Sequence, residues 1–246
     1  METMSQGIKA PRRSLALYAI FLMLTVVVAG LASGLMNDLT AARDRQDLSS
    51  LDACIGKSKQ AAQADPKKAD LQYQLALAYS YAAEVATELH DKKKAESYAE
   101  NGMESAKQAL ASNNGNAEYH RLLGDLCGQV IPANPLLGAL KYGQCARDEI
   151  EKAIQLDAKL ALAYVSQGVG NYYLPSSMGG GIGLALKDFD KAISLNSNLA
   201  EAYLWKGIAL RKAGRNGEAR QVLEKALQLD PNRLWVRQQL DKTPAA

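Results

Sequence analysis

The sequence is poor in the side chains that β-sheets need. Phe occurs twice, and residues 37–246 hold only 6 Val, 7 Ile and 3 Thr. Strands favour β-branched and aromatic residues because these side chains fill a pleated surface. Ala and Leu, which lose least on entering a helix, number 40 and 35 in 246 residues. The composition argues against a β-sandwich, a barrel or a doubly wound α/β fold, and it predicts an all-α protein.

The chain also lacks a strong charge of either sign. Its net charge is +3, and the one lysine run covers residues 92–94. Nucleic-acid modules normally carry a basic stripe, so we expect no nucleic-acid partner. Hydrophobic residues make up 48% of the chain, which is too many for a disordered protein of low net charge.

Recognisable catalytic and metal-binding motifs are missing as well. The two histidines, His90 and His120, belong to no HExxH motif and have no cysteine partner, and no GxSxG motif occurs. The three cysteines do not have the spacing of a zinc site. We therefore expect no enzyme activity, no cofactor and no metal.

One long apolar run occurs, at residues 14–36, and it contains no charged residue. It is long enough to span a bilayer core of about 30 Å. The basic residues Lys9, Arg12 and Arg13 precede it, so residues 1–13 are expected to stay in the cytoplasm. The run is either a retained single-pass anchor or a signal peptide cleaved near residues 32–34. Both interpretations place residues 37–246 outside the cytoplasm.

The carboxyl-terminal part carries a repeat. Residues 200–233 place small side chains at Gly207, Ala219 and Ala226 and large ones at Tyr203 and Leu223. A proline at 231 ends the unit. This pattern resembles the tetratricopeptide repeat, a 34-residue helix–turn–helix.

Weaker copies precede this unit. The starts at 69, 117, 161 and 200 give units of 48, 44 and 39 residues before the last one of 34. We expect part of the excess to lengthen the helices. The prediction is a tetratricopeptide-like α-solenoid of four hairpins over 69–233, in which each unit buries its apolar face against its neighbours. A leading helix over 37–68 precedes the hairpins, and a short cap and tail over 234–246 follow.

Cys127 and Cys145 fall in one hairpin unit. In an oxidising compartment they could form a disulfide bridge between its two helices. Two small buried thiols are the alternative interpretation.

Three stretches, at 118–129, 146–158 and 172–193, are similar to a narrower group. The last contains a leucine–proline turn followed by Met-Gly-Gly. They resemble the exported tetratricopeptide component associated with tripartite ATP-independent periplasmic transporters. The resemblance implies a periplasmic protein, compatible with an oligomer, that binds a small ligand or docks a solute-binding protein. That family is typically lipid-anchored through a cysteine, which this chain would replace with a membrane helix.

The tetratricopeptide resemblance implies that the first helix of each unit lines a concave face. Tyrosine suits such a face because it offers a large contact area at little entropic cost. The alternative is that some of these tyrosines pack inside the long hairpins. The predicted role is an extracytoplasmic scaffold that binds a protein or peptide, and the alternative is the transport component. The candidate binding residues are Tyr73, Tyr81, Arg121, Asp125, Gln129, Tyr172, Tyr173, Arg211 and Lys212.

Overall fold

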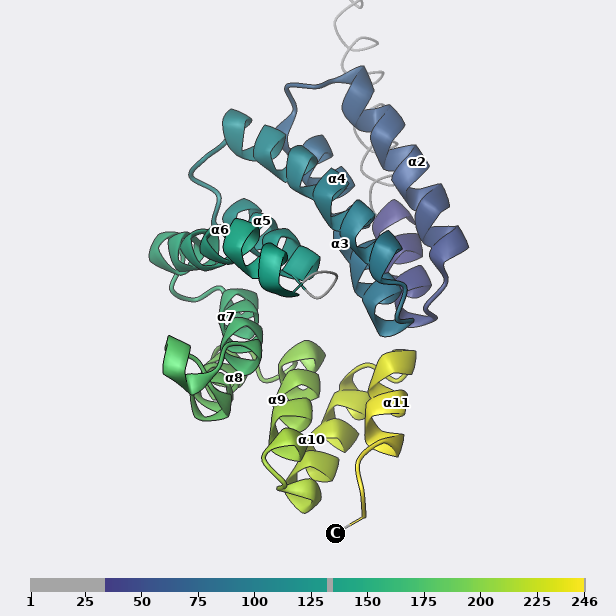
Figure 1. The fold of residues 1–246 in the computed structure, drawn as a ribbon. Coiled ribbons are helices and arrows are strands. Elements are labelled where there is room, and N and C mark those ends of the chain that lie inside the picture. The colour runs from purple at the N-terminus through teal and green to yellow at the C-terminus, as the bar shows by residue number, and fades with distance from the viewer. Residues whose placement is uncertain (1–33, 132–134, 246) are drawn as a thin grey trace, which may run out of the picture. The chain divides into compact units, whose positions relative to one another are not determined.

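A computed structural model describes residues 34–131 and 135–245, and all the regular elements in this part of the chain are helical (Figure 1). The chain divides into two units, residues 1–38 and 39–246, and the second carries the repeats. Its helices are α2 (Leu48–Ala64), α3 (Ala69–Glu88), α4 (Lys92–Ser112), α5 (Ala117–Val130), α6 (Pro135–Leu156), α7 (Ala161–Tyr173), α8 (Ile182–Leu195), α9 (Ala200–Lys212), α10 (Asn216–Leu229) and α11 (Leu234–Asp241).

The helices pair as consecutive hairpins, α3 with α4, α5 with α6, α7 with α8 and α9 with α10. Their first helices begin at residues 69, 117, 161 and 200, where the repeat pattern places them. The surplus length of the early units does extend helices, since α3 and α4 have 20 and 21 residues whereas α9 and α10 have 13 and 14. The described part of the chain is therefore a tetratricopeptide-like solenoid.

Small residues let the two helices of a hairpin approach closely. A Cβ atom at Gly168 in α7 would lie 2.5 Å from the Phe189 ring of α8. At Gly207 in α9 it would lie 2.5 Å from Leu223 Cγ of α10. Phe189 and Leu223 are fully buried, so neither can move aside cheaply. The alternation of glycine and large side chains in the repeat thus has a direct steric cause.

The leading segment is two helical pieces instead of the single helix predicted for 37–68. Residues 39–44 are helical, Gln46 takes a left-handed φ of 55°, and α2 then starts after Asp47. The Asp47 carboxylate accepts a hydrogen bond from Ser50 N at 3.1 Å and caps the new helix. Capping offers the backbone a local alternative to a continuous helix, which composition alone did not reveal.

The connection at 174–183 is a compact turn that includes a short 3₁₀ helix, Ser176–Met178. Gly179 and Gly181 have φ values of 87° and 113°, which favour glycine. Gly181 N donates to Asn171 O at 2.8 Å and closes the turn onto α7. The glycines of this segment therefore serve the backbone of a tight connection.

Hydrogen bonds as well as apolar contacts hold the cap helix α11 in place. Val236 and Gln239 are buried, and the Arg211 guanidinium of α9 donates to Gln239 O at 2.8 Å and to Gln239 Oε1 at 2.7 Å. From its far side, Gln238 Nε2 donates to Gln46 Oε1 at 2.9 Å, across 192 residues of sequence. The end of the solenoid thus contacts its beginning.

Most of the predicted membrane segment, residues 14–33, lies outside the described residues. Within residues 34–131 and 135–245, no helix combines the length and apolar character needed to cross a bilayer.

Candidate functional site: the inner surface of the repeats

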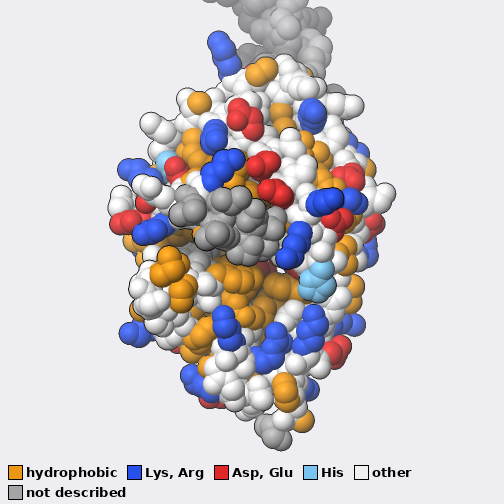
Figure 2. Space-filling view, in the orientation of Figure 1, with side chains coloured by type: hydrophobic (Ala, Val, Ile, Leu, Met, Phe, Trp, Pro, Cys, Tyr) orange, Lys and Arg blue, Asp and Glu red, His pale blue; other side chains and the backbone are white. Residues whose placement is uncertain are grey.

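The first helices of the hairpins and α11 surround a common centre (Figure 1). We call the side chains that meet there the inner surface. Figure 2 shows a hollow on this side of the unit, with a largely hydrophobic floor, acidic side chains in its depth and basic ones around its rim. Three groups of residues make up the inner surface: a closure cluster, a polar network on α3 and α5, and an aromatic cluster.

The closure cluster joins the two ends of the repeat unit around Arg233, which is 1% exposed. Its guanidinium donates to Glu84 Oε1 at 2.6 Å and to both carboxylate oxygens of Glu88, one of them at 3.2 Å. It also donates to Arg43 O at 3.1 Å. Asp44 Oδ1 lies 4.0 Å from Arg233 Nε, which has no hydrogen-bond partner. These contacts bridge 145 to 190 residues of sequence and close the solenoid.

The second group is a polar network on α3 and α5. Arg121 is buried and forms ion pairs with Glu118 and Asp125, one turn away on either side. Tyr73 Oη donates to Glu118 Oε1 at 3.0 Å, and its ring stacks on Tyr119 at 5.1 Å between centroids. Burial raises the pKa values of Tyr73 and Asp125. Each charged side chain of this network thus has a partner of opposite charge within it.

The third group, the aromatic cluster, consists of Tyr172, Tyr173, Trp205 and Trp235. Ring centroids lie 4.9 Å apart for the two tyrosines and 5.5 Å apart for the two tryptophans. Tyr173 is 60% exposed, yet the surrounding walls still raise its pKa through desolvation. An accessible ring enclosed by protein is what a concave surface provides.

Glu201, on the first turn of α9, connects the aromatic cluster with the closure cluster. Its Oε1 accepts a hydrogen bond from Trp205 Nε1 at 2.9 Å. Burial, and next the negative charge of Glu84, raise the pKa of Glu201 to about 7, although Arg233 and Arg43 act in the opposite direction. The same two causes, in the same order, raise the pKa of Glu88 to about 8. The surroundings of Glu88 on α3 and of Glu201 on α9 therefore both disfavour the ionised carboxylate.

The structure brings most of the predicted binding residues to the inner surface. Tyr81 lies there beneath the Arg43 guanidinium, 4.8 Å from the ring centroid. Some of the candidates are engaged by the chain itself: Gln129 donates to Ser80 O at 3.3 Å, and Arg211 holds α11. Lys212 is exposed and donates to Tyr172 O at 3.3 Å. The use of these residues in binding stays a prediction.

Sequence reasoning missed Glu84, Glu88, Glu201 and Arg233. For the first two a signal was present, because Glu84 and Glu88 follow Tyr81 by three and seven residues and so share its helix face. Glu201 likewise precedes Trp205 by four residues. Nothing local indicated Arg233, whose partners lie at the other end of the unit.

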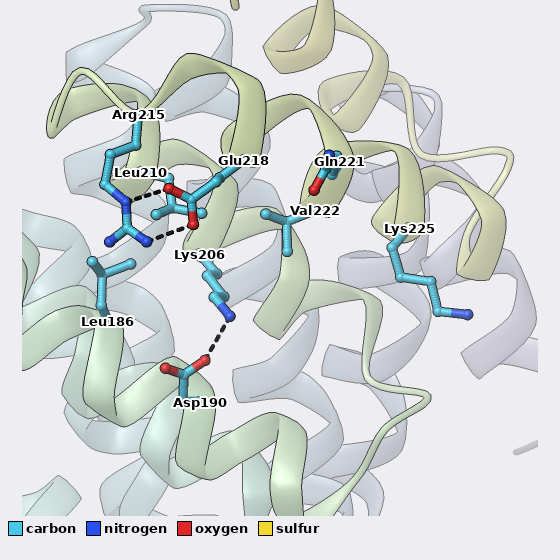
Figure 3. Close-up of a pocket in the computed structure, with 9 residues that line it drawn as sticks. All are labelled: Leu186, Asp190, Lys206, Leu210, Arg215, Glu218, Gln221, Val222 and Lys225. Atoms are coloured by element: carbon cyan, nitrogen blue, oxygen red, sulfur yellow. Dashed lines mark hydrogen bonds and ion pairs between the residues drawn. The ribbon is translucent and has the colours of Figure 1, made fainter.

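A surface pocket of about 310 Å³ lies elsewhere, between α8, α9 and α10 (Figure 3). Figure 3 shows two ion pairs among its lining residues, Lys206 with Asp190 at 2.6 Å and Arg215 with Glu218 at 2.5 Å. None of the predicted binding residues lines it. It is a groove between neighbouring hairpins in which four of the five charged side chains pair with each other.

The Sγ atoms of Cys127 in α5 and Cys145 in α6 are joined in a disulfide bond. It links the two helices of the second hairpin behind the polar network. Among the residues that the structure describes, no group of three or more His, Cys, Asp or Glu side chains could hold a metal ion.

Comparison with known proteins identifies two matching regions. A family model described as Regulator of microtubule dynamics protein 1-3 matches residues 39–175, and a tetratricopeptide repeat model matches residues 200–233. Regulator of microtubule dynamics protein 3 of Xenopus laevis is 33% identical over 96 residues. The alignment covers 39% of this chain and 20% of that protein, so the chain spans about a fifth of the relative's length.

Among solved structures, a thermophilic tetratricopeptide protein from Thermus thermophilus supports the fold. It is 18% identical, with a TM-score of 0.60 over 85% of this chain and 98% of that one. MamA is 23% identical, with a TM-score of 0.40 over 74% of this chain and 90% of that one.

These comparisons do not support the narrower resemblance to the transporter-associated component. They support the tetratricopeptide repeats, and the second family model that matches is the one for Regulator of microtubule dynamics proteins. Because its model covers more than half of the 246 residues, the chain belongs to the family of Regulator of microtubule dynamics proteins 1-3.

Proposed function

We propose that the repeat unit is a scaffold that binds a protein or peptide partner on its inner surface, without catalysis. The observation that carries the proposal is the aromatic cluster, where Tyr173 stays 60% exposed beside Tyr172 and Trp205. Aromatic side chains that are accessible within a concave wall are typical of binding hot spots, because they bury large areas with little loss of entropy. The closed solenoid holds them in place before a partner arrives, which lowers the cost of binding.

Site-specific photocrosslinking tests this function in cells. A photoreactive phenylalanine analogue replaces Tyr173 in the full chain, and the matched control carries it at Leu156, which is 40% exposed at the end of α6. We expect a discrete protein adduct from position 173 and none from position 156. Absence of an adduct at 173, or the same adducts from both positions, would contradict the inner surface as the binding site.

The proposal includes attachment to a membrane through residues 14–36, with the repeats outside the cytoplasm. The uncharged run and the preceding Lys9, Arg12 and Arg13 support it. A mature chain that begins at Met1 or Glu2 agrees with a retained anchor, and one that begins near Leu35 agrees with a cleaved signal peptide. If a reagent confined to the outside of the cell cannot label residues beyond 36, the orientation is wrong.

The transport-associated component remains the alternative within this proposal. There, the partner recovered from position 173 would be a transporter subunit or a solute-binding protein. An open inner surface that takes a peptide favours the scaffold, whereas an enclosed apolar pore would favour the transport component.

The family membership supports a second candidate, which excludes the orientation above because it requires the repeats in the cytoplasm, with the microtubule as the partner. The relatives are named for regulating microtubule dynamics, and the family model covers α2 to α7. Co-sedimentation of the purified full chain with polymerised tubulin tests this role directly. Retention in the supernatant at every tubulin concentration would remove it and leave the scaffold proposal standing.

A further inference from the structure

Glu201 is a carboxylate that no cationic side chain pairs with directly in the described part of the chain. Among the residues that the structure describes, it has no ion-pair partner, and it accepts one hydrogen bond, from Trp205. Arg43 and Arg233 influence it, but closer carboxylates engage both of them. Arg43 lies 2.7 Å from Asp44 Oδ1, and Arg233 lies 2.6 Å from Glu84 Oε1. A partly buried carboxylate in this position is stabilised by any further cation that reaches it.

The closure cluster and Glu201 together hold more carboxyl groups than guanidinium groups. Arg43 and Arg233 face the carboxylates of Asp44, Glu84, Glu88 and Glu201, and Arg43 has a further carboxylate, Asp230, at 3.6 Å. The polar network adds no compensation, since its one guanidinium is already paired with two carboxylates. The excess of carboxyl groups therefore lies where α9 meets the closure cluster, and a cation brought there would favour their ionised forms.

Two rings of the aromatic cluster beside Glu201 already have a cationic side chain of the same chain over them. Lys212 Nζ lies 4.1 Å from the centroid of Tyr172, and the Arg233 guanidinium lies 5.7 Å from that of Trp235. In the described part of the chain, no cation lies over the ring of Tyr173 or Trp205. Ring faces attract Lys and Arg through their quadrupole, most strongly where water is partly excluded. An accessible aromatic face next to a carboxylate is a suitable receptor for a positively charged side chain.

We propose that the partner segment inserts a lysine or arginine side chain between Glu201 and the ring faces of Trp205 and Tyr173. This inference rests on the scaffold function proposed above and adds the chemistry of the partner. The chain as a whole is not attractive to cations, because its net charge is +3. Recognition of a cation must therefore depend on the groups around Glu201 and not on the net charge of the chain. The opposite result of the binding test would be a preference for an acidic partner segment, which could pair with the exposed Lys212.

The probe is a fluorescein-labelled peptide of alternating glycine and lysine, compared with the same peptide acetylated on every lysine. Both are titrated against the detergent-solubilised full chain at low ionic strength, and fluorescence anisotropy is recorded. The variants are Glu201→Gln and Trp205→Phe, with Glu224→Gln on the exposed side of α10 as the matched control. Far-ultraviolet circular dichroism verifies that each variant is folded.

We expect the lysine peptide to bind about tenfold more tightly than the acetylated one, and Glu201→Gln to weaken its binding about tenfold. Glu224→Gln should bind like the wild type. Equal binding of the two peptides, unchanged binding by Glu201→Gln, or binding of an otherwise identical glutamate peptide in preference would each overturn the proposal. If the lysine peptide fails to bind while position 173 still crosslinks a protein, this inference fails and the scaffold function survives.

Discussion

The two halves of the inner surface differ in how far their polar and aromatic groups are engaged by other side chains of the same chain. On α3 and α5, Arg121 is neutralised by Glu118 and Asp125, and the Tyr73 hydroxyl donates to Glu118. On α7, α9 and α11, Tyr173 is largely exposed and Glu201 has a single hydrogen bond from an indole. The first half is satisfied by its own side chains, whereas the second leaves capacity for a partner.

The difference indicates a division of work within one repeat architecture. The satisfied half contains the long hairpins and the disulfide, and it also supplies Glu84 and Glu88, which hold the end of the solenoid. The short hairpins present accessible aromatic rings. Rigidity on one side and unmet interactions on the other are what a preorganised binding surface requires.

The largest expected effect is that of breaking the closure. Arg233→Ala leaves Glu88, whose side chain is 2% exposed, without its ion-pair partner and with Gln46 as the remaining donor. Removal of one member of a buried ion pair costs about 3–5 kcal/mol in the free energy of unfolding. Here Glu84 and Glu88 both lose the guanidinium that stabilises their ionised forms. Urea unfolding followed by circular dichroism measures this change.

The control for the closure is Arg237→Ala, on the exposed side of the same cap helix. It should change the free energy of unfolding by less than about 0.5 kcal/mol. If Arg233→Ala were as mild as this control, the contact between the two ends would contribute nothing to the stability of the solenoid.

The second effect concerns the covalent link in the satisfied half. The Cys127–Cys145 bridge closes a sequence separation of 18 residues. Its removal in the double variant Cys127→Ser/Cys145→Ser should cost about 3 kcal/mol under oxidising conditions. Under reducing conditions the wild type should lose most of this advantage. A wild type that is equally stable with and without reductant would show that the bond does not form in solution.

A pH-dependent effect tests the half with unmet interactions. In the folded chain the pKa of Glu201 is raised to about 7 from the ordinary 4.5, so folding favours the protonated acid. Its stabilising contribution is complete below the lower value and is lost as the pH rises through the higher one. The free energy of unfolding of the wild type, relative to Glu201→Gln, should fall by about 2 kcal/mol between pH values of about 5 and 8. If the difference in free energy of unfolding stayed constant with pH, the surroundings would not raise the pKa of Glu201.

The fold could be predicted from the repeat pattern because the residues that determine each hairpin lie close together in the sequence. Ala219, Leu223 and Ala226 lie at the spacing that buries one face of a helix, and all three are fully buried. Helix starts at 69, 117, 161 and 200 follow from the same register. The break at Gln46 escaped prediction because it depends on the Asp47 cap rather than on periodicity.

The candidate site was only partly accessible to sequence reasoning. The inner face of each first helix follows from the repeat register, and this register is the basis for predicting Tyr73, Arg121 and Tyr173 as binding residues. Which residues of that face remain available depends on side chains far away in sequence. Arg233 meets Glu84 across 149 residues, and the curvature that brings them together accumulates over all the hairpins.

The smallest effect compares one substitution in the two halves. Tyr73→Phe removes a hydroxyl that donates to Glu118 Oε1 at 3.0 Å, and the loss should cost about 1 kcal/mol in the free energy of unfolding. Tyr173→Phe alters an exposed ring and should cost less than about 0.5 kcal/mol. Parallel urea titrations of the two variants resolve this difference when their slopes agree. If Tyr173→Phe proved as costly as Tyr73→Phe, the Tyr173 hydroxyl would be satisfied within the fold, and the aromatic half would have no free capacity there for a partner.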